Sequence, residues 1–372
     1  MTAAALTAGA LSVGAAAEDT FKIGSSGPMT GPAATYGNAV MNAAQIAVDE
    51  INEAGGANGV MLEFNPQDDE HDAEKAVNAY NTLKDWGMQA FLGTVTSGPC
   101  IAVEAEAVND NMFLLTPSGS AVDCITAGDN AFRVCFSDPD QGTASAKYIG
   151  ENGLAEKIAV IYDSSDVYSS GVYATFQAEA ANQPFEIVCA EAFTADSKTD
   201  FSVQLQKAKE SGAELVFLPF YYNEIALVFT QADAMGFAPK WFGVDGMDGI
   251  LTVEGFDTSL TEGVMLLTPF SADAEDERTK NFVAKYQELH NEVPNQFAAD
   301  AYDGVYAIAA AIEKAGITAD MDASEVCDLL KVAMTEISID GVTGTGMTWD
   351  ASGEPSKDPK AVVIENGAYK GM

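Results

Sequence analysis

Strand-like and helix-like segments alternate along most of the chain, and this rhythm limits the folds open to it. Up to residue 116, short apolar runs such as "FKIGS", "VMLEF", "QAFLG" and "MFLLT" are separated by stretches with apolar residues at helical spacing. The same alternation restarts near Asp138 and continues to "KWFGVDG" at 240–246. Strands separated by helices are typical of parallel sheets covered by helices on both faces. We therefore predict an α/β protein with two doubly wound parallel-sheet domains.

The rest of the chain predicts three helices, at about 276–291, 297–314 and 323–335, and then a last strand and turn within "KAVVIENGAYKG". A length of 372 residues exceeds what one hydrophobic core usually supports. No long Pro/Ser linker interrupts the pattern, so short crossovers rather than a flexible tether should join the two domains.

The charge of the chain is strongly acidic, with 56 Asp and Glu residues against 18 Lys and Arg residues and a net charge of −38. Nucleic acids and anionic membranes both require clustered basic residues, so neither is an expected partner. The acidic residues are dispersed along the sequence, which favours a solvated, self-repelling surface adapted to salt.

The first 17 residues, "MTAAALTAGALSVGAAA", carry no charge and are too few to span a bilayer. They resemble the apolar part of a secretory signal, and Ala15 and Ala17 form an A-x-A cleavage pattern before Glu18. We interpret 1–17 as a signal-peptide remnant, with a disordered Ala-rich tail as the alternative. Export to the periplasm or the cell exterior would follow.

Catalytic and metal-binding patterns are missing from the sequence. It has no G-x-S-x-G elbow, no H-E-x-x-H and no Walker loop, and its two histidines offer little for a Ser-His-Asp relay. In "QDDEHDAEKA" we expect a solvated loop in which Asp72 caps the next helix, rather than a metal site. We predict no catalytic residue, no metal and no cofactor. The five cysteines lack C-x-x-C spacing, and Cys100 with Cys124 is the pair that a disulfide would join in an exported protein.

Small hydroxyl residues and glycines gather at the predicted carboxyl ends of strands, where doubly wound sheets bind ligands. "GTVTSGPC" contains Ser97, and "LTPSGSAV" contains Ser118, Gly119 and Ser120. Backbone N–H groups at a helix start favour an anion, and a hydroxyl adds a donor without a permanent charge. An ordinary helix cap is the alternative for either loop alone. Two such loops on neighbouring strands indicate a cradle for a carboxylate.

Other strand ends carry complementary groups. Tyr36, Tyr168 and Tyr221 offer flat amphipathic walls, and Asp245, in "FGVDGMDG", is suited to hold an ammonium group. Packing is the alternative for each tyrosine, and a turn or cap for Asp245. Together they give an anion cradle, a carboxylate and an apolar wall between them, which matches an α-amino acid.

From Phe21 to Trp349 the chain resembles the extracytoplasmic solute-binding proteins of branched-chain amino-acid ABC transporters, which are class I periplasmic binding proteins of the leucine/isoleucine/valine-binding type. The segments that carry this resemblance are "GPMTGPAATYGNAVMNAAQIAVDEIN", "GTVTS", "LLTPSGSA", "RVCFSDPDQGTASAKYI", "KIAVIYD", "DFSVQLQKAK" and "FAADAYDGVYA".

The resemblance implies a Venus-flytrap fold of two doubly wound lobes, joined by three crossovers and closing like a hinge. It assigns 20–138 and 270–347 to the N-terminal lobe and 139–269 and 348–372 to the C-terminal lobe. It implies that the loops of Ser97 and of Ser118 and Ser120 bind the α-carboxylate and share in holding the amine. It also implies that Asp245 pairs with the ammonium group. The wall residues would be Tyr36, Tyr168, Tyr221 and Phe297.

The implied function is to bind a branched-chain, other aliphatic or aromatic amino acid and to deliver it to an ABC permease as a monomer. The alternatives are a binding protein for another small carboxylate or amide, or a ligand sensor. An α/β enzyme such as an amidase or a cofactor-dependent oxidoreductase is disfavoured because neither a nucleophile with a base nor a phosphate-binding glycine turn is found.

The chain departs from the family pattern at several positions. Asp245 stands where typical relatives have the longer Glu, and Ser118 and Ser120 replace small Ala and Thr in the carboxylate loop. A cysteine pair of some relatives maps to His71 and Thr96, so that disulfide is absent here. These changes bear on the identity of the ligand rather than on the fold.

Overall fold

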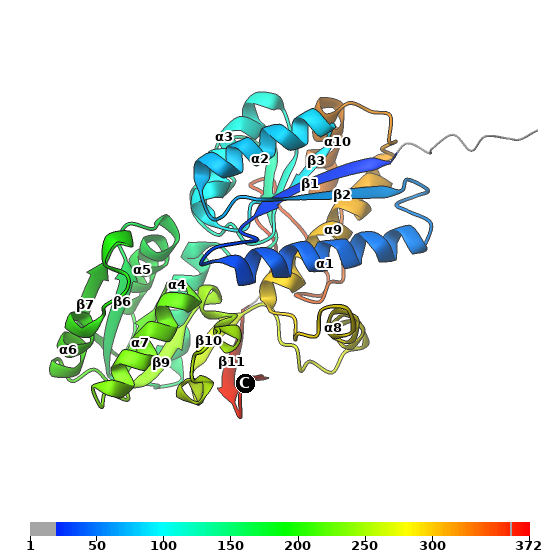
Figure 1. The fold of residues 1–372 in the computed structure, drawn as a ribbon. Helices are drawn as coiled ribbons and strands as arrows, with labels where there is room; N and C mark the ends of the chain where they lie inside the picture. The colour runs from blue at the N-terminus through cyan, green and yellow to red at the C-terminus, as the bar shows by residue number, and fades with distance from the viewer. Residues whose placement is uncertain (1–19, 358) are drawn as a thin grey trace, which may run out of the picture.

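Two lobes, each built around one sheet, make up the computed structural model, which describes residues 20–357 and 359–372 (Figure 1). The signal-peptide interpretation of residues 1–17 lies outside the described residues. The predicted pair of α/β sheets is confirmed.

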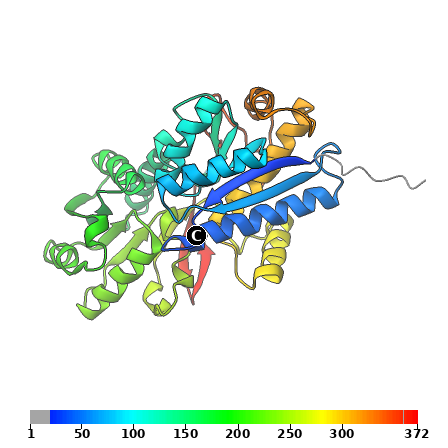
Figure 2. The same ribbon diagram turned by 45° about the horizontal axis from the view of Figure 1, so that its top comes forward.

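The first sheet has the strand order β2-β1-β3-β4-β5, and all its strands run parallel. Because β2 lies on one side of β1 and β3 on the other, the chain changes direction at β1, which leaves a crevice beyond the carboxyl ends of β1 and β3. Figure 2 shows α1 on one side of β1 and β2 and α2 on the other. The strands are β1 (Phe21–Gly27), β2 (Leu62–Asp68), β3 (Ala90–Leu92), β4 (Leu114–Thr116) and β5 (Ala131–Arg133), and the helices between them are α1 (Ala34–Glu53), α2 (Ala73–Trp86) and α3 (Ser97–Asp110).

The second sheet has the order β12-β11-β10-β9-β8-β6-β7. Its β6–β10 strands are parallel, whereas β11 and β12 form an antiparallel hairpin at the edge next to β10. The segment that we predicted as a last strand and turn is this hairpin. The strands are β6 (Lys157–Asp163), β7 (Glu186–Phe193), β8 (Leu215–Leu218), β9 (Lys240–Gly243), β10 (Met265–Thr268), β11 (Lys360–Glu365) and β12 (Ala368–Gly371), with helices α4 (Asp138–Glu151), α5 (Val167–Ala180), α6 (Ser202–Glu210) and α7 (Tyr222–Ala234).

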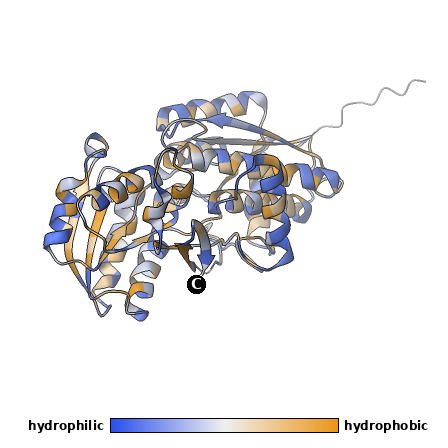
Figure 3. Cartoon of the chain, turned by 60° about the horizontal axis from the view of Figure 1, so that its bottom comes forward, coloured by the Kyte–Doolittle hydropathy of each residue, from blue (hydrophilic) through white to orange (hydrophobic). Residues whose placement is uncertain are grey.

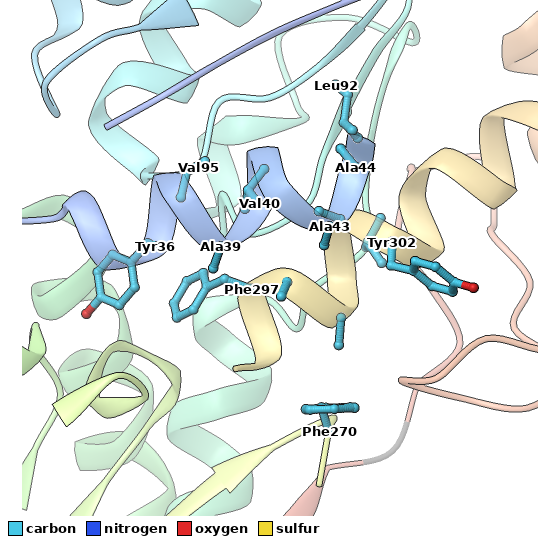
Figure 4. Packing of buried hydrophobic residues seen from close by; sticks show 14 of the residues in the cluster. Tyr36, Ala39, Val40, Ala43, Ala44, Leu92, Val95, Phe270, Phe297 and Tyr302 are labelled. Carbon is cyan, nitrogen blue, oxygen red and sulfur yellow. The ribbon is translucent and has the colours of Figure 1, made fainter. Parts of the chain in front are cut away.

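Three later helices return to the first lobe: α8 (Glu277–His290), α9 (Gln296–Ala315) and α10 (Ala323–Met334). Helix α9 packs along α1, and Figure 4 shows alanines of α1 at this contact. Small side chains on both helices, such as Ala43 and Ala301, are fully buried, so the helix axes can approach closely. At the end of this contact that faces the second lobe, Tyr36 and Phe297 lie ring beside ring.

The chain passes between the lobes three times, at about 134–137, 269–276 and 344–359. On the third passage Trp349 and Gly353 remain against β5: Trp349 Nε1 donates to Arg133 O at 2.7 Å, and Arg133 N donates to Gly353 O at 3.0 Å. The lobe boundaries given above stay a proposal, and these contacts place part of 348–355 on the first sheet.

Figure 3 shows apolar stretches most clearly on strands of the second sheet, and the buried residues of both lobes are mostly apolar. Asp72 accepts a hydrogen bond from Lys75 N at 2.9 Å and caps α2, as predicted. Among the described residues, no helix combines the length and the apolar character needed to cross a membrane.

Candidate functional site

A narrow, nearly filled cavity lies between the lobes at the carboxyl ends of the strands. Eight of the nine residues that the sequence analysis selected line it, together with Val95, Thr96 and Gly246. The exception is Gly119, which lies behind the lining. The eight are Tyr36, Ser97, Ser118, Ser120, Tyr168, Tyr221, Asp245 and Phe297.

Gly119 is required by packing rather than by the cavity. A Cβ atom at this position would lie 2.8 Å from Thr116 Oγ1 and 2.9 Å from Cys100 Sγ, closer than real Cβ contacts. Its N–H donates to Thr116 Oγ1 at 2.7 Å, and Thr116 in turn donates to Thr94 O at 2.7 Å. These bonds tie the loop after β4 to the loop after β3.

The hydroxyls of Ser97 and Ser118 are oriented for different tasks. Ser97 Oγ accepts from Ala121 N at 3.2 Å, which leaves its O–H proton free to donate to a carboxylate. Ser118 Oγ donates its proton to Val95 O at 2.6 Å, which leaves oxygen lone pairs free to accept from an ammonium group. Ser97 is also the first residue of α3, where backbone N–H groups have no intrahelical acceptor.

Asp245 supplies the carboxylate of the site from the loop after β9. It is 6% exposed and accepts from Tyr168 Oη at 2.5 Å, Gln141 Nε2 at 2.9 Å and Gly246 N at 2.7 Å. Burial raises the pKa of the Asp245 carboxyl to about 6, although the hydrogen bonds from Tyr168 and Gln141 lower it. A cationic group in the cavity would favour the ionised form.

Aromatic rings from both lobes form the remaining walls. The Tyr36 and Phe297 rings have centroids 4.2 Å apart, and Tyr168 stacks on Tyr221 with centroids 5.2 Å apart and planes at 13°. Tyr36 also connects the lobes, because its hydroxyl donates to Gly246 O and accepts from Tyr222 N at 3.3 Å. The walls therefore offer apolar faces with their polar ends already bonded.

Three residues near the site were missed by the sequence analysis. Gln141 holds Asp245, Arg133 donates to carbonyls of the loop after β4, and Asp138 is buried at the start of α4. Burial raises the pKa of Asp138, and a hydrogen bond from the Ser120 side chain lowers it. The sequence indicates a special role for one of the three, because Arg133 is a lone cation inside the apolar run "AFRVCF". Gln141 lies on a helix and gave no such signal.

The structure has no disulfide bond at the cysteines considered for one. All five cysteines are free thiols, so Cys100 and Cys124 are not joined. Both are fully buried, and Cys124 Sγ lies 3.7 Å from Ser97 O. At the two positions of the other cysteine pair considered from the sequence, His71 Nδ1 and Thr96 Oγ1 make a hydrogen bond of 2.8 Å.

Comparison with known proteins gives consistent matches. A periplasmic binding protein family model matches residues 20–368. The leucine-, isoleucine-, valine-, threonine- and alanine-binding protein of Pseudomonas aeruginosa is 29% identical over 316 residues, 85% of this chain and 83% of that protein. Leu/Ile/Val-binding protein homolog 3 of Brucella melitensis is 32% identical over 303 residues, 80% of each chain.

A solved structure agrees with these relatives. The branched-chain amino acid transporter substrate-binding protein LivJ from Streptococcus pneumoniae, in complex with isoleucine, superposes with a TM-score of 0.85 and 30% identity. The match covers 94% of this chain and 98% of that one. With a family model matched over nearly all of the described residues, the chain belongs to the periplasmic binding protein family.

Proposed function

We propose that this protein binds an α-amino acid with an aliphatic or aromatic side chain between its lobes and delivers it to an ABC permease. Binding involves no covalent step, and the protein acts outside the cytoplasm. The relatives named above support this assignment, because they are named for binding leucine, isoleucine and valine. LivJ of Streptococcus pneumoniae was solved with isoleucine.

The observation that carries the proposal is the division of polar groups between the lobes. The first lobe contributes the free Ser97 O–H and the open N–H groups at the start of α3, whereas the second contributes the buried Asp245 carboxylate. An α-carboxylate meets the first set and an α-ammonium the second. Tyr36, Tyr221 and Phe297 offer the apolar faces that the side chain would contact.

A thermal-shift screen of the purified protein tests the proposal. The twenty amino acids are compared with small carboxylates, amides and aromatic acids. A ligand at about 1,000 times its dissociation constant stabilises the native state by roughly 4 kcal/mol, which raises the melting temperature. We expect isoleucine, leucine or valine to give the largest shift. A shift only with ligands that lack an α-amine would contradict the role of Asp245 and favour a binding protein for other small carboxylates.

Delivery requires a second experiment in cells. Deletion of the gene should abolish uptake of the labelled amino acid that the screen identifies, and expression of the protein should restore it. Normal uptake in the deletion strain would favour the ligand-sensor alternative over transport.

A further inference from the structure

Arg133 ends β5 with a side chain that is completely buried, and its guanidinium lies behind the loop that carries Ser118 and Ser120. Nη1 donates to Gly119 O at 3.2 Å and to Ser120 O at 2.5 Å, and Nη2 donates to Ala121 O at 3.1 Å. Three successive carbonyl groups are thus fixed by one planar, charged donor.

Fixing these carbonyls also fixes the direction of the N–H groups, because the C=O and N–H of one peptide unit point in opposite directions. The Gly119 carbonyl points toward Arg133, so the Ser120 N–H points away from it. That N–H has no hydrogen-bond acceptor among the residues that the structure describes. Ser120 itself lines the cavity, so its N–H is available to a ligand carboxylate.

Charge supports the same role. The residues that line the cavity include Asp245 but no lysine, arginine or histidine, so a ligand carboxylate meets only neutral donors there. Arg133 places a full positive charge one layer behind those donors. Its ion-pair partner, Glu354, lies 3.2 Å from Nε with a side chain that is 36% exposed, so water weakens that opposing charge. The other nearby acid, Asp138, is buried, and burial raises the pKa of its carboxyl, which favours the neutral form.

We propose that Arg133 is a positioning residue for the carboxylate end of the ligand. It holds the loop at 119–121 so that the Ser120 N–H faces the cavity, and its buried charge favours an anion there. This inference rests on the proposed function and adds a residue behind the loop to those that determine how the carboxylate is bound.

The test compares isoleucine with isoleucinamide, which keeps the ammonium and the side chain but carries no anionic charge. Competition calorimetry at pH 7 gives both dissociation constants for the wild type and for Arg133→Met, Arg133→Lys and Glu354→Gln. Because charge-assisted hydrogen bonds contribute about 1.5–3 kcal/mol, we expect Arg133→Met to weaken isoleucine binding roughly 10- to 150-fold. Binding of isoleucinamide should change much less, so the preference for the acid over the amide falls.

Arg133→Lys keeps the charge but not the planar guanidinium with its several N–H donors, so it should recover part of the preference for the acid. Glu354→Gln keeps both the charge and the carbonyl contacts, so it should keep the preference at or above that of the wild type. If a folded Arg133 variant loses affinity for both ligands equally, Arg133 is only structural and the inference is wrong. If Arg133→Met does not fold, the other two variants decide. The inference is wrong if Arg133→Lys keeps the wild-type preference for isoleucine over isoleucinamide and Glu354→Gln reduces it. A wild type that binds no amino acid would instead contradict the proposed function.

Discussion

Replacement of Asp245 by Asn is the sharpest test of the site, because the two side chains have nearly the same shape. Asn keeps an oxygen for the Tyr168 hydroxyl, which bonds Asp245 Oδ1 at 2.5 Å, but removes the negative charge from a side chain that is 6% exposed. Removing one partner of a buried ion pair costs about 3–5 kcal/mol, which corresponds to a loss of roughly 150- to 5,000-fold in affinity for an amino acid.

The same substitution should stabilise the protein without ligand. The pKa of Asp245 is about 6 in the folded protein against an ordinary value of 3.8, so folding disfavours its ionised form. This destabilisation is absent below pH 3.8, grows between pH 3.8 and 6, and is complete above pH 6. At pH 7.5 the ligand-free Asp245→Asn variant should therefore unfold at a higher temperature than the wild type. The gain of about 3 kcal/mol is reduced by the loss of the bond from Gln141 Nε2 to Oδ2, because the Asn amide is itself a donor.

Isothermal titration calorimetry with isoleucine and thermal melts without ligand measure the two effects. Asp248→Asn is the matched control, because burial raises the pKa of Asp248 to about 6 as well, but Asp248 does not line the cavity. Asp248 Oδ2 accepts from Gln296 N at 2.8 Å across the lobes, and the Asn oxygen preserves this bond, so the control should keep its affinity. If Asp245→Asn binds isoleucine as tightly as the wild type, the ammonium group lies elsewhere and our reasoning about the cavity fails.

Because binding needs ionised Asp245 and its pKa is about 6, the affinity for isoleucine should fall as the pH is lowered through 6. Calorimetry between pH 5 and 8 should show this fall, and Asp245→Asn should make the affinity nearly independent of pH. Tyr36→Phe removes the hydroxyl that bonds Gly246 O and Tyr222 N across the lobes, so affinity should drop by about 5- to 10-fold. Small-angle scattering should show a more open ligand-bound protein, and an unchanged scattering profile would argue against this role. Lys357→Met leaves the buried carboxylate of Asp300 without its partner, which lies at 2.6 Å and is 1% exposed. Urea unfolding should therefore show a loss of about 3–5 kcal/mol in the free energy of unfolding. The double variant with Asp300→Leu should recover much of this loss, and equal stabilities of the single and double variants would refute this account.

Most of the fold could be predicted from the sequence because the alternation of strands and helices is a local signal. The strands that escaped prediction, β5, β10 and β12, are three or four residues long. "AFR" and "MLLT" are too short to show a period, and only pairing with β4 or with β9 and β11 makes them strands. Their assignment therefore depends on tertiary contacts.

The site could be predicted as far as it lies at strand ends. Ser97, Ser118 and Asp245 follow strands directly, so the sheet topology itself brings them together. Gln141 reaches Asp245 from a helix, and the bond from Tyr36 to Gly246 exists only when the lobes meet. Neither contact is encoded in local sequence, because each depends on how separate segments pack.

The order in which strands enter the second sheet restricts how this molecule can be divided. Strands β6–β10 come from residues 157–268, but the β11–β12 hairpin comes from 360–371, after α8–α10 have been added to the first lobe. During synthesis, one edge of β10 therefore stays unpaired while about ninety residues of the other lobe are made. No single cut in the chain separates the lobes, so an isolated second lobe would need residues 360–371 rejoined through an engineered linker. Exchange of whole lobes between relatives must likewise replace two separate stretches of sequence at once.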